Sequence, residues 1–158
     1  MGITPDTKDW TWVLERPCPE CGFDASAVEP AQLGARIRAT LPLWPEILSR
    51  ADATTRPRPE VWSPVEYACH VRDVFRVFDE RVRLMLDEDE PQFANWDQDA
   101  SAIVGRYGEQ DPATVVQELL AAGDVIAARF DSVPDDAWAR RGRRSNGSIL
   151  SGKPSMTN

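Results

Sequence analysis

The features that most constrain this chain are two long segments whose apolar residues recur every three or four positions. Such spacing places one apolar stripe along an α-helix and is incompatible with a strand. The first segment begins at Ser63, a residue that can cap a helix, followed by Pro64 at the first helical position and Glu66 at the third. The second follows the cap residue Asp111. The stripes are Tyr67, Val71, Val74, Phe75, Phe78, Val82 and Met85, and Val115, Val116, Leu119, Leu120, Gly123, Ile126, Ala127 and Phe130.

Two weaker helical patterns complete the secondary structure that we predict. Residues 30–52 keep helical spacing, but Pro42 and Pro45 remove backbone donors within it, so we expect a kink or a break there. Residues 93–107 form a shorter connecting helix closed by Gly108, and the helix from Pro64 should end near the acidic run that starts at Asp87. No segment alternates with period two for long enough to predict a strand. The sequence therefore predicts an all-α fold.

Composition and charge limit the classes of function. A chain of 158 residues with 42% apolar residues is one globular domain. Its formal net charge of -8 is opposite in sign to the field that attracts nucleic acid, so no nucleic-acid partner is expected. No apolar run is long enough to span a membrane, and the start of the chain lacks the basic and apolar regions of a signal peptide. We expect a cytoplasmic protein with no membrane partner.

The chain divides into three parts by composition. Residues 1–28 form an irregular arm rich in Trp, Pro and Cys, residues 29–140 form the helical bundle, and residues 141–158 are polar and rich in Gly and Ser. We predict that this last part is a disordered tail.

His70 is the only histidine and lies on the flank of the first stripe, one helical turn from both Glu66 and Val74. A catalytic metal site needs roughly three protein ligands, and imidazole is a common one. A single histidine fits equally the commoner role of a hydrogen-bonded residue at the edge of a core.

Cys18 and Cys21 lie in the motif Cys-Pro-Glu-Cys-Gly, which has the spacing of half a zinc site. Three interpretations remain open: a structural zinc site, a redox-active pair, and a turn stiffened by proline. The remaining cysteine, Cys69, is a helix-packing residue in our interpretation, because it and His70 point about 100° apart on a helix and so do not easily serve one ion.

Several separated segments resemble one known family. The arm TKDWTWVLERPCPECGFDAS, the helix start VWSPVEYACHVRDV, and FANWDQDA followed by RYGEQDP are similar, in this order, to an actinobacterial branch of the DinB-like proteins. The resemblance covers residues 6–144. It implies an antiparallel four-helix bundle with up-down-down-up topology and a long crossover between the second and third helices.

The resemblance also implies a metal centre. In that family a histidine that matches His70 joins two histidines of the last helix to hold a divalent metal. Several members use the metal, which for imidazole ligands can be zinc, nickel or iron, to activate a low-molecular-weight thiol such as mycothiol for transfer of the sulfur. This chain instead continues from WARRGRRSNG into SILSGKPSMTN. We therefore expect the last helix and two of the three ligands to be missing.

Two functions follow from the resemblance. The first is a metal-dependent thiol S-transferase, acting on a small thiol and an electrophile and impaired by the missing helix. The alternative is a non-catalytic, DinB-like helical binding or stress-associated protein. An uncovered groove in place of the last helix would favour a homodimer that buries the stripe residues Val74, Phe78 and Phe130.

Overall fold

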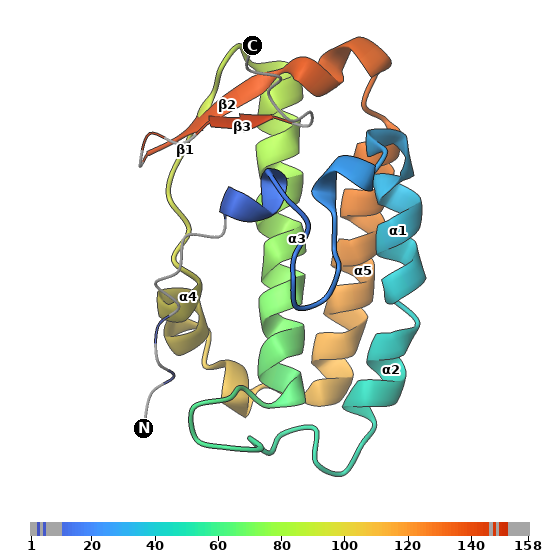
Figure 1. Cartoon of the computed structure of the whole chain (residues 1–158). Helices are drawn as coiled ribbons and strands as arrows, with labels where there is room; N and C mark the ends of the chain where they lie inside the picture. Colours follow the sequence, from blue (N-terminus) through green and yellow to red (C-terminus); the bar gives the residue numbers. More distant parts are fainter. Residues whose placement is uncertain (1–2, 4, 6–10, 146, 148, 152–158) are drawn as a thin grey trace.

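The computed structural model describes residues 3, 5, 11–145, 147 and 149–151 of the chain. Its longest element is the helix α3, Pro64–Asp87 (Figure 1). The capping box predicted at its start is present, because the Ser63 hydroxyl accepts from the backbone N–H of Glu66 while the Glu66 carboxylate accepts from that of Ser63. Without these bonds, donors at the first turn would be left unsatisfied.

The second long helix is α5, Pro112–Asp131, which packs mainly on α3. Asp111 caps it as expected, accepting from the N–H of Thr114 at 2.9 Å. Figure 1 shows that α3 and α5 run in the same direction and that the long segment between them returns along the outside of the bundle. This arrangement confirms the predicted crossover between the second and third helices.

The break expected near Pro42 divides the first helical segment into α1, Leu33–Thr40, and α2, Leu43–Leu48, which run opposite to α3 in Figure 1. The 3-10 turn η3, Pro30–Gln32, precedes α1. α1 lies very close to α5, since a Cβ atom on Gly34 would meet the carbonyl oxygen of Ala127 at 2.7 Å. The absence of that atom allows the two helices to approach.

The crossover differs from the single helix predicted over residues 93–107. It contains the strand β1, Gln92–Phe93, the helix α4, Gln98–Val104, and the 3-10 turn η4, Tyr107–Glu109. α4 begins late because the Asp97 side chain accepts from the N–H groups of two following residues.

The prediction of disorder from residue 141 onward is wrong for the described part of that segment. After the 3-10 turn η5, Asp135–Ala139, the chain forms β2, Arg141–Arg144, and β3, Ile149–Ser151. β2 pairs antiparallel with β3 and parallel with β1, with Arg143 opposite both Ile149 and Gln92. This polar run carries no strand signal because its order comes from pairing with a strand about fifty residues away. Residues 152–158 of the predicted tail lie outside the described residues.

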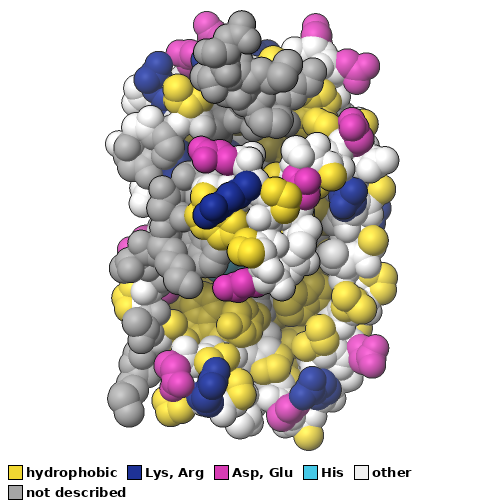
Figure 2. Space-filling model, in the orientation of Figure 1, with side chains coloured by type: hydrophobic (Ala, Val, Ile, Leu, Met, Phe, Trp, Pro, Cys, Tyr) yellow, Lys and Arg dark blue, Asp and Glu magenta, His cyan; other side chains and the backbone are white. Residues whose placement is uncertain are grey.

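The arm is short and irregular where it is described, with 3-10 turns at Thr11–Leu14 and Ala25–Ala27. Figure 1 shows it crossing the face of the bundle between α3 and α1. Below it in the view, Figure 2 shows hydrophobic side chains gathered in a hollow over the lower parts of the helices. Most of the arm before residue 11 lies outside the described residues.

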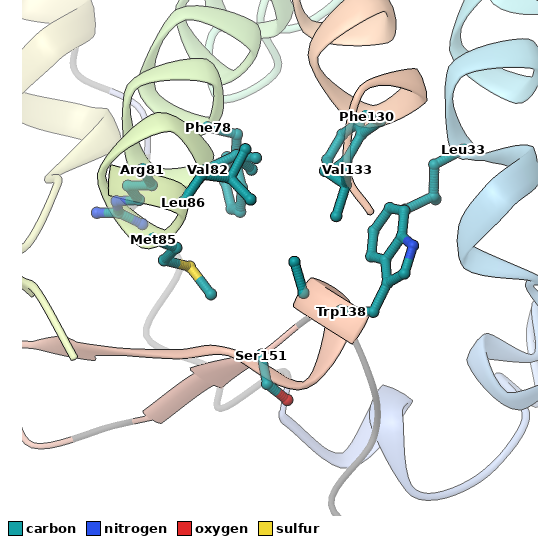
Figure 3. A pocket seen from close by; sticks show the side chains of 11 residues that line it. Leu33, Phe78, Arg81, Val82, Met85, Leu86, Phe130, Val133, Trp138 and Ser151 are labelled. Atoms are coloured by element: carbon teal, nitrogen blue, oxygen red, sulfur yellow. The ribbon is translucent and has the colours of Figure 1, made fainter. Parts of the chain in front are cut away.

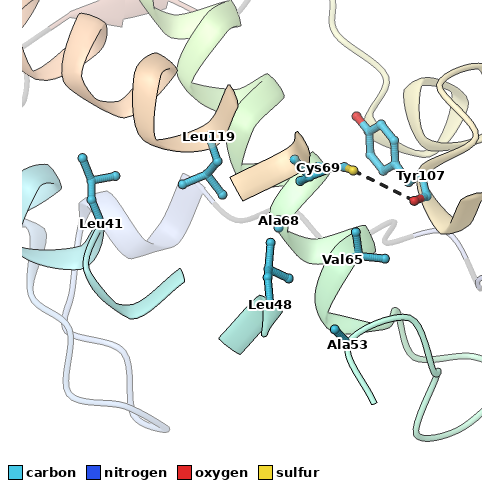
Figure 4. Packing of buried hydrophobic residues seen from close by; sticks show 9 residues of the cluster. Leu41, Leu48, Ala53, Val65, Ala68, Cys69, Tyr107 and Leu119 are labelled. Carbon is cyan, nitrogen blue, oxygen red and sulfur yellow. Dashed lines mark hydrogen bonds between the residues drawn. The ribbon is translucent and has the colours of Figure 1, made fainter. Parts of the chain in front are cut away.

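The main core lies between α2, α5 and the first half of α3 (Figure 4). Its buried members, all at most 6% exposed, are Leu41, Leu48, Ala53, Val65, Ala68, Cys69, Tyr107, Val115 and Leu119. The expectation that Cys69 is a packing residue therefore holds. Within the described part of the chain, no helix is long and apolar enough to cross a membrane.

Candidate functional site

His70 lies in an aromatic cluster on the outer side of α3. The centroid of its ring lies 5.6 Å from that of Trp96, and the two ring planes are stacked at 13°. The centroid of the Trp62 ring lies 5.3 Å away. Trp62 precedes α3 and Trp96 belongs to the crossover, so the cluster ties these segments together. The buried Nδ1 atom of His70 has no hydrogen-bond partner among the described residues. Among the described residues, the imidazole is held in place by packing against these two rings and not by a hydrogen bond to Nδ1.

Burial lowers the pKa of His70, and the nearby carboxylates of Asp73 and Asp99 oppose that shift only in part. The imidazole is therefore neutral at pH 7. A neutral imidazole suits a metal ligand and a buried core residue equally well, so the protonation state alone does not distinguish the two roles.

A polar network lies beside His70. The buried guanidinium of Arg72 donates to Asp73 at 2.9 Å and to Glu118 of α5 at 2.7 Å. The Tyr107 hydroxyl donates to the other carboxylate oxygen of Asp73. Burial and this hydrogen bond raise the pKa of Tyr107, so the hydroxyl stays protonated. Because each carboxylate in the network already has a donor, the network serves as a cross-link between α3, η4 and α5.

Glu66, one turn before His70, has a different structural role. Its carboxylate is only 6% exposed and accepts from both Arg56 and the N–H of Ser63. Burial opposes ionisation, but these hydrogen bonds outweigh it and lower the pKa of Glu66. Glu66 therefore stabilises the start of α3 and pairs with Arg56.

The described residues do not fit a metal centre. They contain no group of three or more histidine, cysteine, aspartate or glutamate side chains that could hold an ion. His70 faces tryptophan rings on two sides, and Cys69, next to it in sequence, points into the core with its pKa raised by burial to about 11. The weaker metal candidates, Cys18 and Cys21, lie in the arm as free thiols. The structure does not bring them together with His70 in any group of ligands.

A separate pocket lies at the opposite end of α3 (Figure 3). It has a volume of about 250 Å³ and is lined almost wholly by apolar side chains. Its lining residues are Leu33, Phe78, Arg81, Val82, Met85, Leu86, Phe130, Val133, Ala137, Trp138 and Ser151.

Three parts of the chain build this pocket. The second half of α3 supplies one wall, and the end of α5 with the following turn supplies another. Trp138 of η5 closes a third side, its ring stacked 6.2 Å from that of Phe130 at 14°. Figure 3 shows the guanidinium of Arg81 pointing away from the cavity, where it donates to the carbonyl of Ala94 at 3.1 Å. The charged atoms thus lie outside an apolar chamber.

The sequence locates some of these residues but not their role. Phe78, Val82, Met85 and Phe130 belong to the predicted stripes, which indicate a closed core or, for Phe78 and Phe130, a dimer surface. Trp138 was missed. The available signal was a tryptophan shortly after Pro134, in a stretch with no helical period.

Comparisons with known proteins agree on the fold. A sequence model described as the DinB superfamily matches residues 32–155. The solved structure of YfiT from Bacillus subtilis, described as a probable metal-dependent hydrolase with an unusual four-helix bundle topology, superposes with a TM-score of 0.65. It is 18% identical, and the match covers 78% of this chain and 71% of YfiT. No curated protein matches. At this identity the likeness to YfiT shows a shared fold.

Proposed function

The chain belongs to the DinB superfamily, and within that family we propose that it is a non-catalytic binding domain that holds a small apolar molecule in the pocket at the end of α3. The observation that carries the proposal is the apolar pocket formed by α3, α5 and Trp138. Ligand sites are typically concave and mostly apolar, with few polar groups.

The size of the pocket supports a ligand of one or two rings. An apolar cavity of about 150 Å³ is enough to bind benzene in a protein interior. The pocket here is larger, at about 250 Å³, and partly open to solvent. Since each buried apolar Å² contributes roughly 25 cal/mol, burial of a bicyclic molecule contributes several kcal/mol, most of which the cost of association offsets, so we expect weak binding.

Indole is a suitable probe, because it is neutral, mostly apolar and soluble. We expect that indole at ten times its Kd raises the melting temperature of the chain by about 3–5 °C. Val133→Phe places a ring in the pocket and should abolish that shift. Val125→Phe makes the same change on the exposed side of α5, where Val125 is 52% exposed, and should leave the shift intact. Equal shifts in wild type and Val133→Phe, or no shift in wild type, would overturn the proposal.

A metal-dependent thiol S-transferase is the second candidate function. It is favoured by the likeness in fold to YfiT, a probable metal-dependent hydrolase, and by the buried Nδ1 of His70 that has no partner among the described residues. A further ligand or ion at that nitrogen would satisfy it. The described residues offer no complete set of metal ligands, so any metal bound at His70 would need ligands from elsewhere.

Bound metal separates the two candidates. We would measure metal per chain by elemental mass spectrometry for the Cys18→Ser/Cys21→Ser chain and for the same chain with His70→Ala. The serine background removes metal held by those thiols. Metal that is present near one per chain and lost with His70 supports the enzyme. If neither variant contains metal, the metal-dependent enzyme is rejected as a candidate.

A further inference from the structure

The motif around Cys18 and Cys21 forms a closed turn in the arm. The N–H of Cys18 donates to the carbonyl of Phe23 at 2.8 Å, and the N–H of Gly22 donates to the carbonyl of Cys18 at 2.8 Å. Gly22 has a φ of 74°, in the left-handed region that glycine adopts without strain. The turn therefore fixes both cysteines at the two ends of one short loop.

The backbone of this turn is arranged to stabilise a thiolate. The backbone N–H groups of Cys21 and Glu20 point toward the sulfur of Cys18, and the Cys21 thiol lies next to it. Successive N–H groups that point at one atom form an anion-binding concavity of the kind that surrounds metal-bound sulfur. The two sulfur atoms therefore lie side by side.

Two thiolates make half of a tetrahedral zinc site, which in proteins takes four ligands. Among the described residues, no third histidine, cysteine or carboxylate joins this pair. Cys69 cannot do so, because it is fully buried in the core and contacts the carbonyl of Tyr107. The missing ligands must therefore come from outside the described part of this chain.

The surface of the turn is open to a second molecule. Cys21 is exposed, Cys18 is half-buried, and the intervening Pro19 and Glu20 are exposed as well. The same face of another copy presents the same two thiols, so a two-fold contact supplies four sulfur ligands without any other residue.

We propose that Cys18 and Cys21 of two chains together hold one Zn²⁺ ion, which bridges the chains through four thiolates. Each cysteine loses its proton as the Zn–S bond forms, so up to four protons are released per ion and no atom is oxidised or reduced. This site is independent of the pocket at the end of α3. A disulfide between the two cysteines would need an oxidant, and the experiment below distinguishes it from zinc binding.

The test is a titration of the reduced, metal-free chain with Zn²⁺, followed by light scattering and elemental analysis. We expect the mass to double from that of the 17.7 kDa chain, with one zinc per two chains, and a chelator to reverse the change. Co²⁺ in place of Zn²⁺ should give the absorption bands of a tetrahedral tetrathiolate. Cys18→Ser/Cys21→Ser should remain monomeric and bind no metal, whereas Cys69→Ala should behave as wild type.

Any one of several results would overturn the proposal. They are one zinc per monomeric chain, no zinc binding, a dimer that forms equally without metal or with both serines, and a Co²⁺ spectrum of mixed ligands. The two cysteines could also form an intramolecular disulfide that persists when zinc and a thiol reductant are added. That result would reject the zinc proposal in favour of a redox pair. Because both cysteines lie in an exposed turn, the serine variants should fold, and circular dichroism checks this directly.

Discussion

Both halves of α3 present apolar side chains to other parts of the bundle, but the packing around these side chains differs. In the first half, Val65 and Ala68 are fully buried against α2, α5 and η4. In the second half, Phe78, Val82 and Leu86 surround an open chamber instead. The helix is the same and only its partners differ.

The difference in partners explains the difference in packing. At the first half, large side chains from several elements fill the space, among them Tyr107, which is 1% exposed. At the second half, the partners are the end of α5, the short turn η5 and the strand β3, which touches the pocket through Ser151. An amphipathic stripe thus shows which face of a helix is apolar, while its neighbours decide whether that face becomes core or pocket.

The largest expected effect on the free energy of unfolding comes from matched leucine truncations in the two halves of α3. Leu119→Ala in the closed core should lower the free energy of unfolding by about 3 kcal/mol, because the surroundings cannot collapse into the space. Leu86→Ala at the pocket should cost about 1 kcal/mol, since that side chain already borders a void. Urea unfolding measures both. Equal losses would mean that the two halves are packed alike and that the comparison is wrong.

A smaller effect concerns the strand that closes the open half. A Cβ atom on Gly142 would lie 2.3 Å from the ring of Phe93 and 3.2 Å from Met85. Because Phe93 is 5% exposed and also packs under the guanidinium of Arg81, its ring has little room to move. Gly142→Ala should therefore cost about 2 kcal/mol by overpacking, measured by urea unfolding.

Gly108→Ala is the matched control for that substitution. Its new Cβ would lie 3.4 Å from the nearest atom, an ordinary contact, so the change in unfolding free energy should stay within about 0.5 kcal/mol. Equal tolerance of alanine at both glycines would mean that β2 does not pack tightly against Phe93. β2 would then not close the open half of α3.

The sequence predicts the closed half better than the open half, for a physical reason. The α3 start, the α5 start and the break near Pro42 depend on residues within a few positions of each other, so local rules locate them. β2 depends on Pro91 and Phe93, whose carbonyl oxygens accept from the N–H groups of Arg143 and Ser145. No local pattern in the polar run after Arg140 indicates such a pairing.

The candidate site could be predicted only in part for the same reason. His70 stands out because it is the only histidine, and its predicted place on α3 is correct. Its stacking on Trp96 was not foreseen, since the two residues lie 26 positions apart on different elements. The pocket was missed because its walls meet only in the folded chain.

The smallest expected effect tests whether His70 is a packing residue of the closed half. His70→Phe keeps a ring between Trp62 and Trp96 and removes a buried nitrogen that has no described partner. The free energy of unfolding at pH 7.5, measured with urea, should therefore change by less than about 1 kcal/mol.

The same variant has a distinct signature in pH. Because the pKa of His70 is lower in the folded chain than its ordinary value of 6.5, the unfolded chain binds more protons in the range just below that value. The wild type should therefore be fully stabilised above pH 6.5 and lose that contribution as the pH falls toward the folded pKa. Melting temperatures of His70→Phe should show a smaller decline between pH 7 and 5, and the Val125→Phe control should follow the wild type. A steeper decline in His70→Phe would show that protonation of His70 stabilises the fold, and the aromatic cluster would then be a cation site and not an extension of the core.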